Sequence, residues 1–249
     1  MRIAALISGG KDSIYTLCQM IDDGHNVVCA IYILNKQEYV DSFMYQTVGN
    51  EMIQYIEQAL EIDFIYKETT CEVKNTDLDY KPMENDEVED LFEAIREAKE
   101  KYGIDGVCSG AILSQYQRNR VQNICNRLKI ESFTPLWQKN QKELLNEMIL
   151  YGIEARLVKI ASPVINKTYL NRTLEDISEY FEKNHDKMSE INYCGEGGEY
   201  ETVVFDCKHY KKKIQARTWI KHIHPEDKNK NEDEQVVYCS FDDIEMHKK

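Results

Sequence analysis

The sequence has little proline, no long apolar run and fewer basic than acidic residues, and each shortage excludes a class of protein. Only 4 of its 249 residues are proline and 42% are hydrophobic, which excludes a collagen-like or Pro-rich disordered chain. The longest apolar run, residues 27–34, covers about eight residues, whereas a membrane-spanning helix needs about 20. Lys+Arg is 31 and Asp+Glu is 44, a formal charge of −13. We therefore expect no membrane partner and no direct nucleic-acid binding.

The eight cysteines lack the paired spacing of a metal site or redox motif. No two of them stand as C-x-x-C, and several lie inside apolar runs. The first ten residues run straight into a glycine-rich segment, without the cleavage-like site of a signal peptide. Free, buried thiols in a reducing compartment are the better interpretation, so a cytoplasmic location is expected.

Short apolar segments alternate with helical patterns through the first half of the chain. The expected strands are residues 2–8, 27–34, 63–67 and 106–109. The expected helices are residues 11–23, the second half of 44–60, 86–102 and 116–128. Such alternation predicts an α/β domain over residues 1–130, with a parallel sheet covered by helices on both faces. Sheets of this type bind ligands beyond the carboxyl ends of their strands.

The alternating pattern weakens after residue 130, which predicts a second, smaller domain of mixed α+β type over residues 131–249. Ordered segments are expected at 144–151, 155–160 and 173–185. Strands are expected at residues 203–206, 213–219 and 236–241. Residues 224–235 contain Pro225 and mixed charges, and they predict an exposed loop.

The most informative segment is Ser8-Gly9-Gly10-Lys11-Asp12-Ser13, between an expected strand and an expected helix. Two glycines allow a sharp turn and a close backbone approach, and free N–H groups at a helix start bind anions. The lysine adds positive charge, and the two serines add hydroxyl groups. Asp12 would repel phosphates unless a cation intervenes, so we expect Mg²⁺ near it, bound mainly through phosphates and water. The alternative is a tight turn with Asp12 as a helix-start residue.

This hexamer is neither a Walker A loop nor a dinucleotide fingerprint, because the required glycine spacing is missing. It resembles the S-G-G-x-D-S signature of the PP-loop ATP pyrophosphatases. The resemblance implies a HUP-type α/β fold and cleavage of ATP between its α- and β-phosphates. It also implies that Ser8, Gly9, Gly10, Lys11, Asp12 and Ser13 bind ATP, with Gly110 approaching the nucleotide.

Three further segments narrow the resemblance: Met44-Tyr45-Gln46-Thr47-Val48-Gly49, residues 110–118, and Cys194-Gly195-Glu196-Gly197-Gly198-Glu199-Tyr200-Glu201-Thr202. Together with the hexamer they resemble the diphthine–ammonia ligases, also called diphthamide synthetases. The sequence departs from that pattern at Asn50, where a histidine is expected. The resemblance implies ATP-dependent amidation of diphthine on elongation factor 2 by ammonium. The reaction would pass through an acyl-adenylate and release AMP and pyrophosphate, with ATP and Mg²⁺ as the cofactors.

The resemblance also implies roles for single residues. The catalytic candidates are Lys11, Asp12, Glu196 and Glu199, and Asp12 is the metal candidate. The substrate-binding candidates are Tyr45, Gln46, Thr47, Arg118, Gly197, Gly198 and Tyr200. A glutamate in the glycine-rich segment could take a proton from ammonium, bind Mg²⁺ or pair with the quaternary ammonium of diphthine. Without the resemblance, both glutamates are solvated carboxylates in a turn.

The residues alone leave three questions open. Tyr193, Tyr200 and Trp137 could offer aromatic faces to the substrate cation. Arg118 and Arg120 could reach a phosphate or the elongation factor, or they could form a solvated helix face. The competing functions are a PP-loop enzyme that modifies tRNA and a non-catalytic ATP-binding sensor.

Overall fold

The computed structural model describes residues 1–35, 44–46, 48–69, 73–184 and 191–249. Its contacts divide the chain into two compact units. The first unit contains Met1–Ser8, Asp12–Thr47 and Ile62–Gln138, and the second contains Gly9–Lys11, Val48–Glu61 and Lys139–Lys249. The glycine-rich hexamer therefore contributes residues to both units. No helix in the described ranges is both long and apolar enough to cross a membrane.

The first unit contains a five-stranded sheet with the order β3-β2-β1-β4-β5, in which every neighbouring pair is parallel. The strands are β1 (Arg2–Leu6), β2 (Asn26–Asn35), β3 (Asp63–Thr69), β4 (Gly106–Cys108) and β5 (Glu131–Phe133). The chain moves outward from β1 through β2 to β3, and then returns to the other side of β1 for β4 and β5. The order thus reverses between β1 and β4, which is where open α/β sheets bind their ligands.

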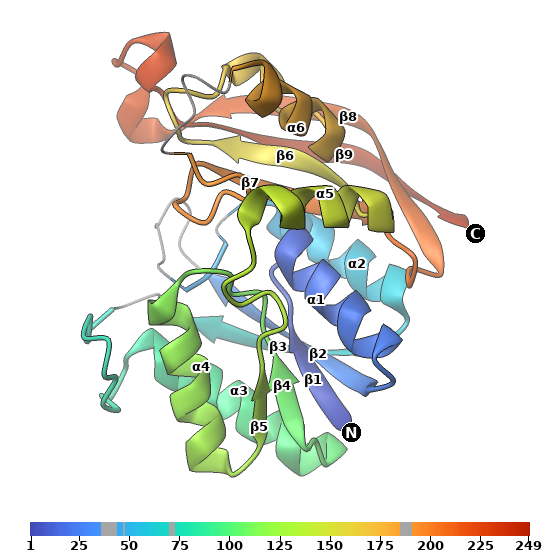
Figure 1. The fold of residues 1–249 in the computed structure, drawn as a ribbon, viewed down its shortest axis with the longest axis vertical. Helices are drawn as coiled ribbons and strands as arrows, with labels where there is room; N and C mark the ends of the chain where they lie inside the picture. The colour runs from blue at the N-terminus through green and yellow to red at the C-terminus, as the bar shows by residue number, and fades with distance from the viewer. Residues whose placement is uncertain (36–43, 47, 70–72, 185–190) are drawn as a thin grey trace. The chain divides into compact units, whose positions relative to one another are not determined.

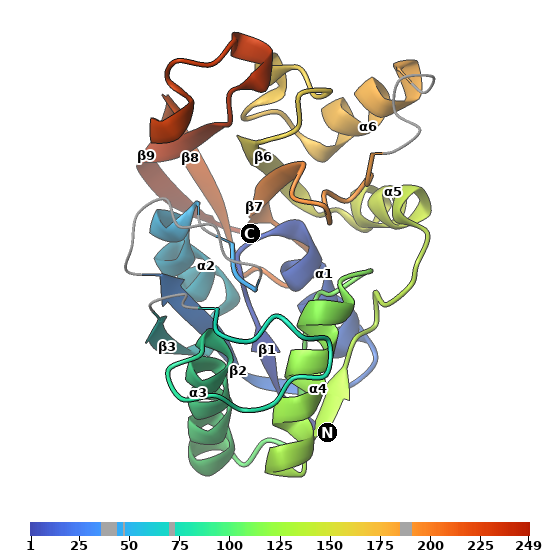
Figure 2. The same ribbon diagram turned by 90° about the vertical axis from the view of Figure 1, so that its left-hand side faces the viewer.

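Helices cover both faces of this sheet, as the sequence predicts. They are α1 (Lys11–Asp22), α3 (Glu87–Tyr102) and α4 (Gln115–Leu128). Right-handed crossovers on the two sides of β1 place α1 on one face and α3 and α4 on the other (Figure 1). Figure 2 shows α3 and α4 in front of the sheet. The prediction of a parallel α/β sheet is therefore confirmed.

The core between this sheet and α3 and α4 is aliphatic, but one charged residue enters it. Arg120 is fully buried on α4, where its guanidinium lies over the ring of Tyr116 and donates to the backbone carbonyls of Asn75 and Asp77. Both interpretations offered for Arg120, a contact with phosphate or partner and a solvated helix face, are wrong. Its guanidinium donors fix the 75–77 segment against α4, a contact distant in sequence that helical spacing does not reveal.

The second unit contains a four-stranded antiparallel sheet with the order β7-β6-β9-β8. Its strands are β6 (Glu154–Ile160), β7 (Tyr200–Asp206), β8 (Lys212–Ile223) and β9 (Val237–Lys248), and its helices are α2 (Ile53–Leu60), α5 (Gln141–Tyr151) and α6 (Leu174–Lys183). The expected mixed α+β character is confirmed. Strands β8 and β9 extend beyond the expected segments because they pair with each other along their whole length.

The segment that joins β8 to β9 is not the wholly exposed loop that its composition predicts. It contains two short 3-10 turns, and the side chain of Asp227 is buried. Asp227 pairs with Lys230 and accepts a hydrogen bond from the backbone N–H of Val236, and both contacts hold the pKa of its carboxyl below the ordinary value. A carboxylate that binds a local N–H folds this segment into a compact turn.

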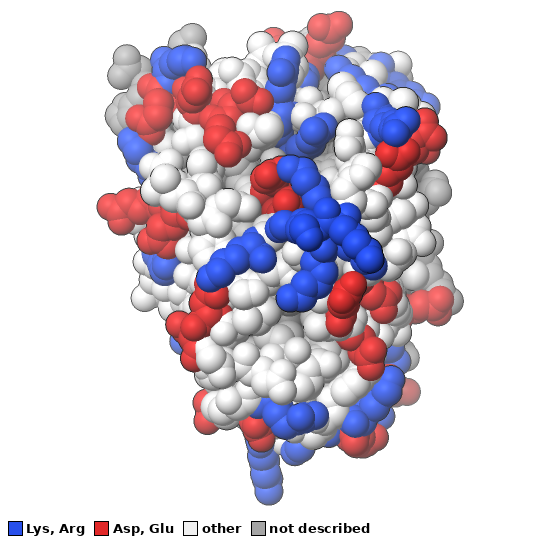
Figure 3. All heavy atoms as spheres, turned by 90° about the vertical axis from the view of Figure 1, so that its right-hand side faces the viewer, with Lys and Arg blue, Asp and Glu red and all other residues white. Residues whose placement is uncertain are grey.

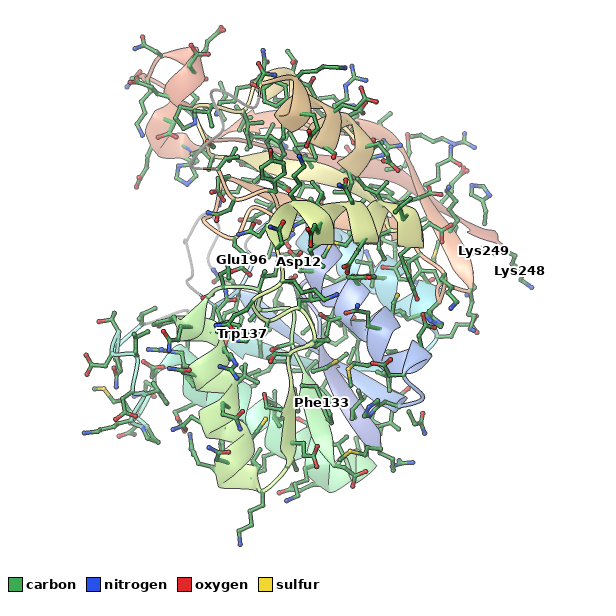
Figure 4. All side chains as sticks on the ribbon, viewed as in Figure 1. Asp12, Phe133, Trp137, Glu196, Lys248 and Lys249 are labelled. Carbon is green, nitrogen blue, oxygen red and sulfur yellow. The ribbon has the colours of Figure 1, made fainter. Side chains whose placement is uncertain are left out.

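The open end of the β8–β9 hairpin gathers positive charge. Register places Lys212 opposite Lys248. Lys248 and Lys249 lie at the outer end of β9 (Figure 4). Figure 3 shows Lys and Arg side chains gathered on the side of the molecule where the C-terminus lies. Like charges directly opposite each other destabilise a β-ladder.

Replacing Lys248 with glutamate is therefore expected to stabilise the protein. The new carboxylate would face Lys212 across the ladder and would raise the free energy of unfolding by about 0.5 kcal/mol. Urea unfolding at low ionic strength measures the change. The control is Lys248→Gln, which removes the repulsion but adds no attraction and should give a smaller gain. Equal stability of all three proteins would show that the register charges do not interact.

All seven cysteines that the structure describes are free and buried, which confirms the expectation for those residues. Burial raises the pKa of the Cys29, Cys108, Cys125 and Cys239 thiols to about 12.

These four thiols are expected to resist alkylation by iodoacetamide in the native protein at pH 8, because only the thiolate reacts. Denaturation in urea should make all four reactive. Residue-resolved mass spectrometry measures the labelling. Rapid native labelling of Cys108, which lies at the end of β4, would contradict its burial.

Candidate active site

The glycine-rich hexamer forms the turn between β1 and α1. Gly9 adopts a left-handed φ of +88°, and a Cβ added there would come within 3.0 Å of the Ile53 side chain. The Ser13 hydroxyl accepts a hydrogen bond from the Ser8 N–H at 3.2 Å and lies 3.2 Å from the Ser8 hydroxyl. The left-handed conformation thus favours glycine at position 9, and the two serines close the turn.

Gly110 follows β4 and packs directly against the first turn of α1. A Cβ at this position would come within 2.9 Å of Asp12 C and Ser13 N, which are backbone atoms that cannot move aside. Glycine therefore allows the segment after β4 to approach the helix start. The structure brings Gly110 and Asp12 together at the carboxyl ends of the parallel strands, where sheets of this type bind ligands.

Within the second unit, Lys11 of the hexamer contacts the other glycine-rich segment, residues 194–202. The residue is 2% exposed, and its ammonium donates to the Cys194 carbonyl at 2.5 Å and lies 5.0 Å from the centre of the Tyr200 ring. Its backbone N–H donates to the Thr202 hydroxyl at 3.1 Å, and Gly9 accepts from the Val204 N–H at 3.0 Å. Strand β7 thus holds Gly9–Lys11 beside the turn that carries Glu196 and Glu199.

Glu199 organises that turn. Its carboxylate accepts from the backbone N–H of Asn192 at 3.1 Å, the side-chain amide of Asn192 at 2.7 Å and the N–H of Gly197 at 2.8 Å. A Cβ on Gly197 would lie 2.7 Å from the Asn192 amide nitrogen and 2.8 Å from Glu199 Oε1. The glycine at 197 therefore makes room for the carboxylate. Glu196 lies at the tip of the same turn and is half-buried (Figure 4).

The other sequence-predicted residues occupy the first unit. The Tyr45 hydroxyl donates to the Glu87 carbonyl at the start of α3, and Gln46 is half-buried. Thr47 lies outside the described residues. Arg118, on α4, places its guanidinium 4.5 Å from the centre of the Trp137 ring. In this structure the Trp137 face offered to a substrate cation is thus covered by Arg118. In the second unit, Tyr200 is only 2% exposed.

The hexamer carries one carboxylate that could hold a cation, that of Asp12. Asp12 is half-buried in the first turn of α1 (Figure 4). The described part of the chain contains no group of three or more His, Cys, Asp or Glu side chains that could hold a metal. One carboxylate with phosphate oxygens and water fits Mg²⁺, which seldom uses an all-protein cage. A zinc-type site would need more ligands than these.

Comparison with known proteins identifies the family. The sequence model described as the diphthamide synthase N-terminal domain matches residues 1–132, and that of the diphthamide synthase C-terminal domain matches residues 140–235. The chain belongs to the diphthamide synthase family. The resemblance drawn from the four motifs is thereby confirmed.

Relatives of this diphthamide synthase family member are diphthine–ammonia ligases. The mouse protein of that name is 42% identical over 220 residues, which cover 86% of this chain and 82% of the mouse protein. The Schizosaccharomyces pombe ligase is 38% identical over 86% of this chain, but the match spans only 36% of that longer protein. A predicted tRNA methyltransferase subunit from Methanocaldococcus jannaschii matches in structure with a TM-score of 0.39 and 16% identity, over 84% of this chain and 98% of that one.

Sequence reasoning missed three residues that organise the site of this family member. Gln141, on α5, accepts from the Cys194 N–H at 2.9 Å and donates to the Asn192 side chain at 2.9 Å. Asn192 binds Glu199, and Thr202 accepts from Lys11. Asn192 lies two residues before the glycine-rich segment and Thr202 is its last residue, so their positions carried a signal. Gln141 lies 53 residues from Cys194, and its polar side chain is indistinguishable from those of solvated helix residues.

Two glycines of the turn that carries Glu196 and Glu199 allow a prediction about stability in which one variant is the control for the other. Gly195 and Gly198 both have left-handed φ angles, of +73° and +81°. A Cβ on Gly195 would come within 2.7 Å of the Tyr200 carbonyl, whereas a Cβ on Gly198 meets nothing within 4 Å. Both alanine variants bear backbone strain of roughly 1 kcal/mol, but only Gly195→Ala must displace the backbone.

Gly195→Ala is therefore expected to lower the melting temperature more than Gly198→Ala, which serves as its control. Differential scanning fluorimetry measures both. A larger loss for Gly198→Ala would contradict the close packing of Gly195 on the Tyr200 backbone.

Proposed function

We propose that this protein catalyses the ATP-dependent amidation of diphthine on elongation factor 2, with ammonium as the nitrogen source. One observation supports the proposal above all: the Lys11 ammonium of the PP-loop hexamer binds the Cys194 carbonyl of the glycine-rich segment. The lysine of the phosphate-binding turn and the segment that sets this family apart thus belong to one site. Relatives that align with most of this chain are named diphthine–ammonia ligases.

The reaction must first activate a carboxylate, which is a poor electrophile. A carboxylate oxygen of diphthine attacks the α-phosphorus of ATP, and the bond from that phosphorus to the bridging oxygen breaks, so that pyrophosphate leaves. Ammonia then attacks the acyl carbon of the adenylate, and the bond to the AMP oxygen breaks. The surplus proton of ammonium passes to a base, and the products are the amide, AMP and pyrophosphate. The protein must align the reactants and stabilise the charge on pyrophosphate.

The hexamer supplies the groups that stabilise the charge on pyrophosphate. The N-terminus of α1 presents backbone N–H groups to an anion, and Ser8, Ser13 and Lys11 add hydroxyl and ammonium donors. In our proposal the Lys11 ammonium exchanges the Cys194 carbonyl for phosphate oxygens when ATP binds. Asp12 would hold Mg²⁺ through its carboxylate, and the cation would neutralise the phosphates that Asp12 alone would repel.

The two glutamates have different surroundings, which supports different roles. Glu199 accepts three hydrogen bonds inside the turn, so we assign it the positioning of that turn. We assign Glu196, at the tip, to the substrate side, where it takes the ammonium proton or pairs with the trimethylammonium group.

We retain Tyr45, Gln46, Thr47, Arg118, Gly197, Gly198 and Tyr200 as substrate-side candidates. We also propose residues 1–130 as the ATP-binding domain, residues 131–249 as the substrate-side domain, and a cytoplasmic location.

The test is an assay with purified protein, ATP, Mg²⁺, ¹⁵N-ammonium and elongation factor 2 carrying diphthine. We expect the mass change of a carboxylate converted to an amide, with one AMP and one pyrophosphate formed per amide. The label should enter without glutamine. ATP binding without turnover would favour the sensor, and adenylation that depends on tRNA would favour the tRNA-modifying enzyme. Either result would refute the proposal.

A further inference from the structure

A groove of about 870 Å³ opens on the second unit, and it shares no residue with the hexamer or with the 194–202 segment. We call it the β8 groove. One wall is the row Trp219, Lys221 and Ile223 on β8, and the other is formed by residues 166–173 and the start of α6. Arg156 and Val237 complete its lining, together with residues around 232–235. This volume suits a polypeptide segment or a ligand of similar size.

The register of the sheet places one end of this groove in line with the candidate active site. Ile223 pairs with Val237, Ile160 pairs with Val237 on its other side, and Ile160 pairs with Tyr200. Tyr200 packs against Lys11 and ends the glycine-rich turn. Three strand spacings of about 4.8 Å therefore separate Ile223 from Tyr200, roughly 14 Å in all. About four residues of an extended chain span that distance.

The outer side of the groove is an unpaired strand edge. Strand β8 is the last strand of its sheet, and beyond β9 no other strand of the described chain pairs with it. Three large apolar side chains near its end are exposed: Trp219, Ile220 and Ile223. A long edge strand with free N–H and C=O groups accepts an added strand, with neighbouring side-chain sites to select the sequence.

The charges that line the groove favour an acidic segment. Four cations, Arg156, Lys167, Arg172 and Lys221, face three carboxylates, those of Asp176, Glu232 and Asp233. Asp176 is already committed to the capping box of α6, where it accepts from the Thr173 N–H. Burial lowers the pKa of Lys167, the nearby Asp233 opposes the change, and Lys221 adds to it. The lining thus has one more cation than carboxylates, and its net positive charge attracts a carboxylate.

We propose that an extended, carboxylate-bearing segment of the protein substrate pairs with the free edge of β8 as an added strand and turns alternate side chains into the β8 groove. A carboxylate of the segment pairs with Lys167 and Lys221, and an apolar side chain packs on Trp219 and Ile223. The inference rests on the proposed function, because it takes the partner to be the protein whose side chain is amidated. Docking here would hold the partner about 14 Å from the glycine-rich turn and would orient the modified residue.

The experiment compares variants of exposed β8 residues that leave the candidate active site intact. Lys221→Glu places a carboxylate where the segment should bring its own, and Trp219→Ala removes the apolar wall. Each should raise the KM for diphthine-bearing elongation factor 2 about tenfold, with the KM for ATP and kcat at saturating protein unchanged. Lys221→Arg should restore the KM. Ile220→Ala is the matched control, because Ile220 is similarly exposed but lies on the opposite face of β8, outside the groove lining.

The Kd for the same elongation factor, measured by biolayer interferometry without ATP, separates failure of this inference from failure of the proposed function. An inactive wild-type protein would refute the proposed function. The docking site would then be tested by binding alone, and we expect Lys221→Glu to raise the Kd about tenfold. An unchanged KM and Kd in Lys221→Glu and Trp219→Ala would overturn the docking site. A weakening by Ile220→Ala as large as that by Trp219→Ala would also overturn it.

Discussion

Lys11→Ala is expected to abolish amide formation, with a fall in kcat/KM of about 10³-fold or more. Removal of a single preorganised donor from a site of developing negative charge typically costs about 10²- to 10³-fold, and Lys11 carries a full charge. The residue is 2% exposed and lies at the helix start, where the leaving pyrophosphate would gather charge. Single-turnover assays that quantify AMP, pyrophosphate and the amide measure the effect. The adenylation step itself should be lost, so neither pyrophosphate nor AMP should appear.

The control must separate the charge of Lys11 from its tethers, because Lys11 also links β7 to the glycine-rich turn. Thr202→Val removes the acceptor of the Lys11 backbone N–H but keeps the ammonium. We expect this variant to lose about 1–2 kcal/mol of stability, from the lost hydrogen bond of a buried N–H, and to retain measurable product. Wild-type rates in Lys11→Ala would refute the phosphate-binding assignment. Equal loss in both variants would show that the tether, not the charge, limits activity.

The elements that formed as expected are those whose stability is encoded locally. Helix α3 begins after Asp86, whose carboxylate accepts from the Val88 N–H as an N-cap, and Gly103 ends it in a left-handed conformation. Glu87, Glu89 and Asp90 lie in its first turn, where the helix dipole favours negative charge. The conformation of the hexamer is also encoded by neighbouring residues, because its glycines and its lysine follow shortly after strand β1. Short-range patterns therefore predicted the parallel sheet and the position of the glycine-rich turn between β1 and α1.

The features that were missed depend on contacts between distant segments. Strand β5 has the sequence Glu-Ser-Phe, which contains no apolar run like that of β4, and it is a strand because it pairs with β4. From the sequence alone, Arg120 is indistinguishable from an exposed arginine, because its partners are the distant backbone carbonyls of residues 75 and 77. Gln141 becomes a site residue only through Cys194 and Asn192. Sequence motifs named the two glutamates, but only the hydrogen bonds of the folded turn distinguish their surroundings.

Glu199→Gln is expected to abolish product by disordering the glycine-rich turn, and to lower stability as it does so. An amide has one acceptor oxygen, and its NH₂ group would face a backbone N–H donor from Asn192 or Gly197. Mispairing at a carboxylate that accepts three hydrogen bonds should cost about 2–3 kcal/mol. Urea unfolding measures the stability, and the amide assay measures the activity. A stable, fully active Glu199→Gln protein would contradict the positioning role.

Glu196→Gln is the matched comparison, because it makes the same chemical change three residues earlier in the same turn. If Glu196 handles the proton or cation of the substrate, its loss should lower the rate of amide formation about 10²- to 10³-fold and leave the free energy of unfolding nearly unchanged. Pyrophosphate release should persist, since adenylation precedes the attack of ammonia. An intact rate in Glu196→Gln would instead make it a solvated carboxylate. The base would then have to come from another part of the protein or from AMP itself.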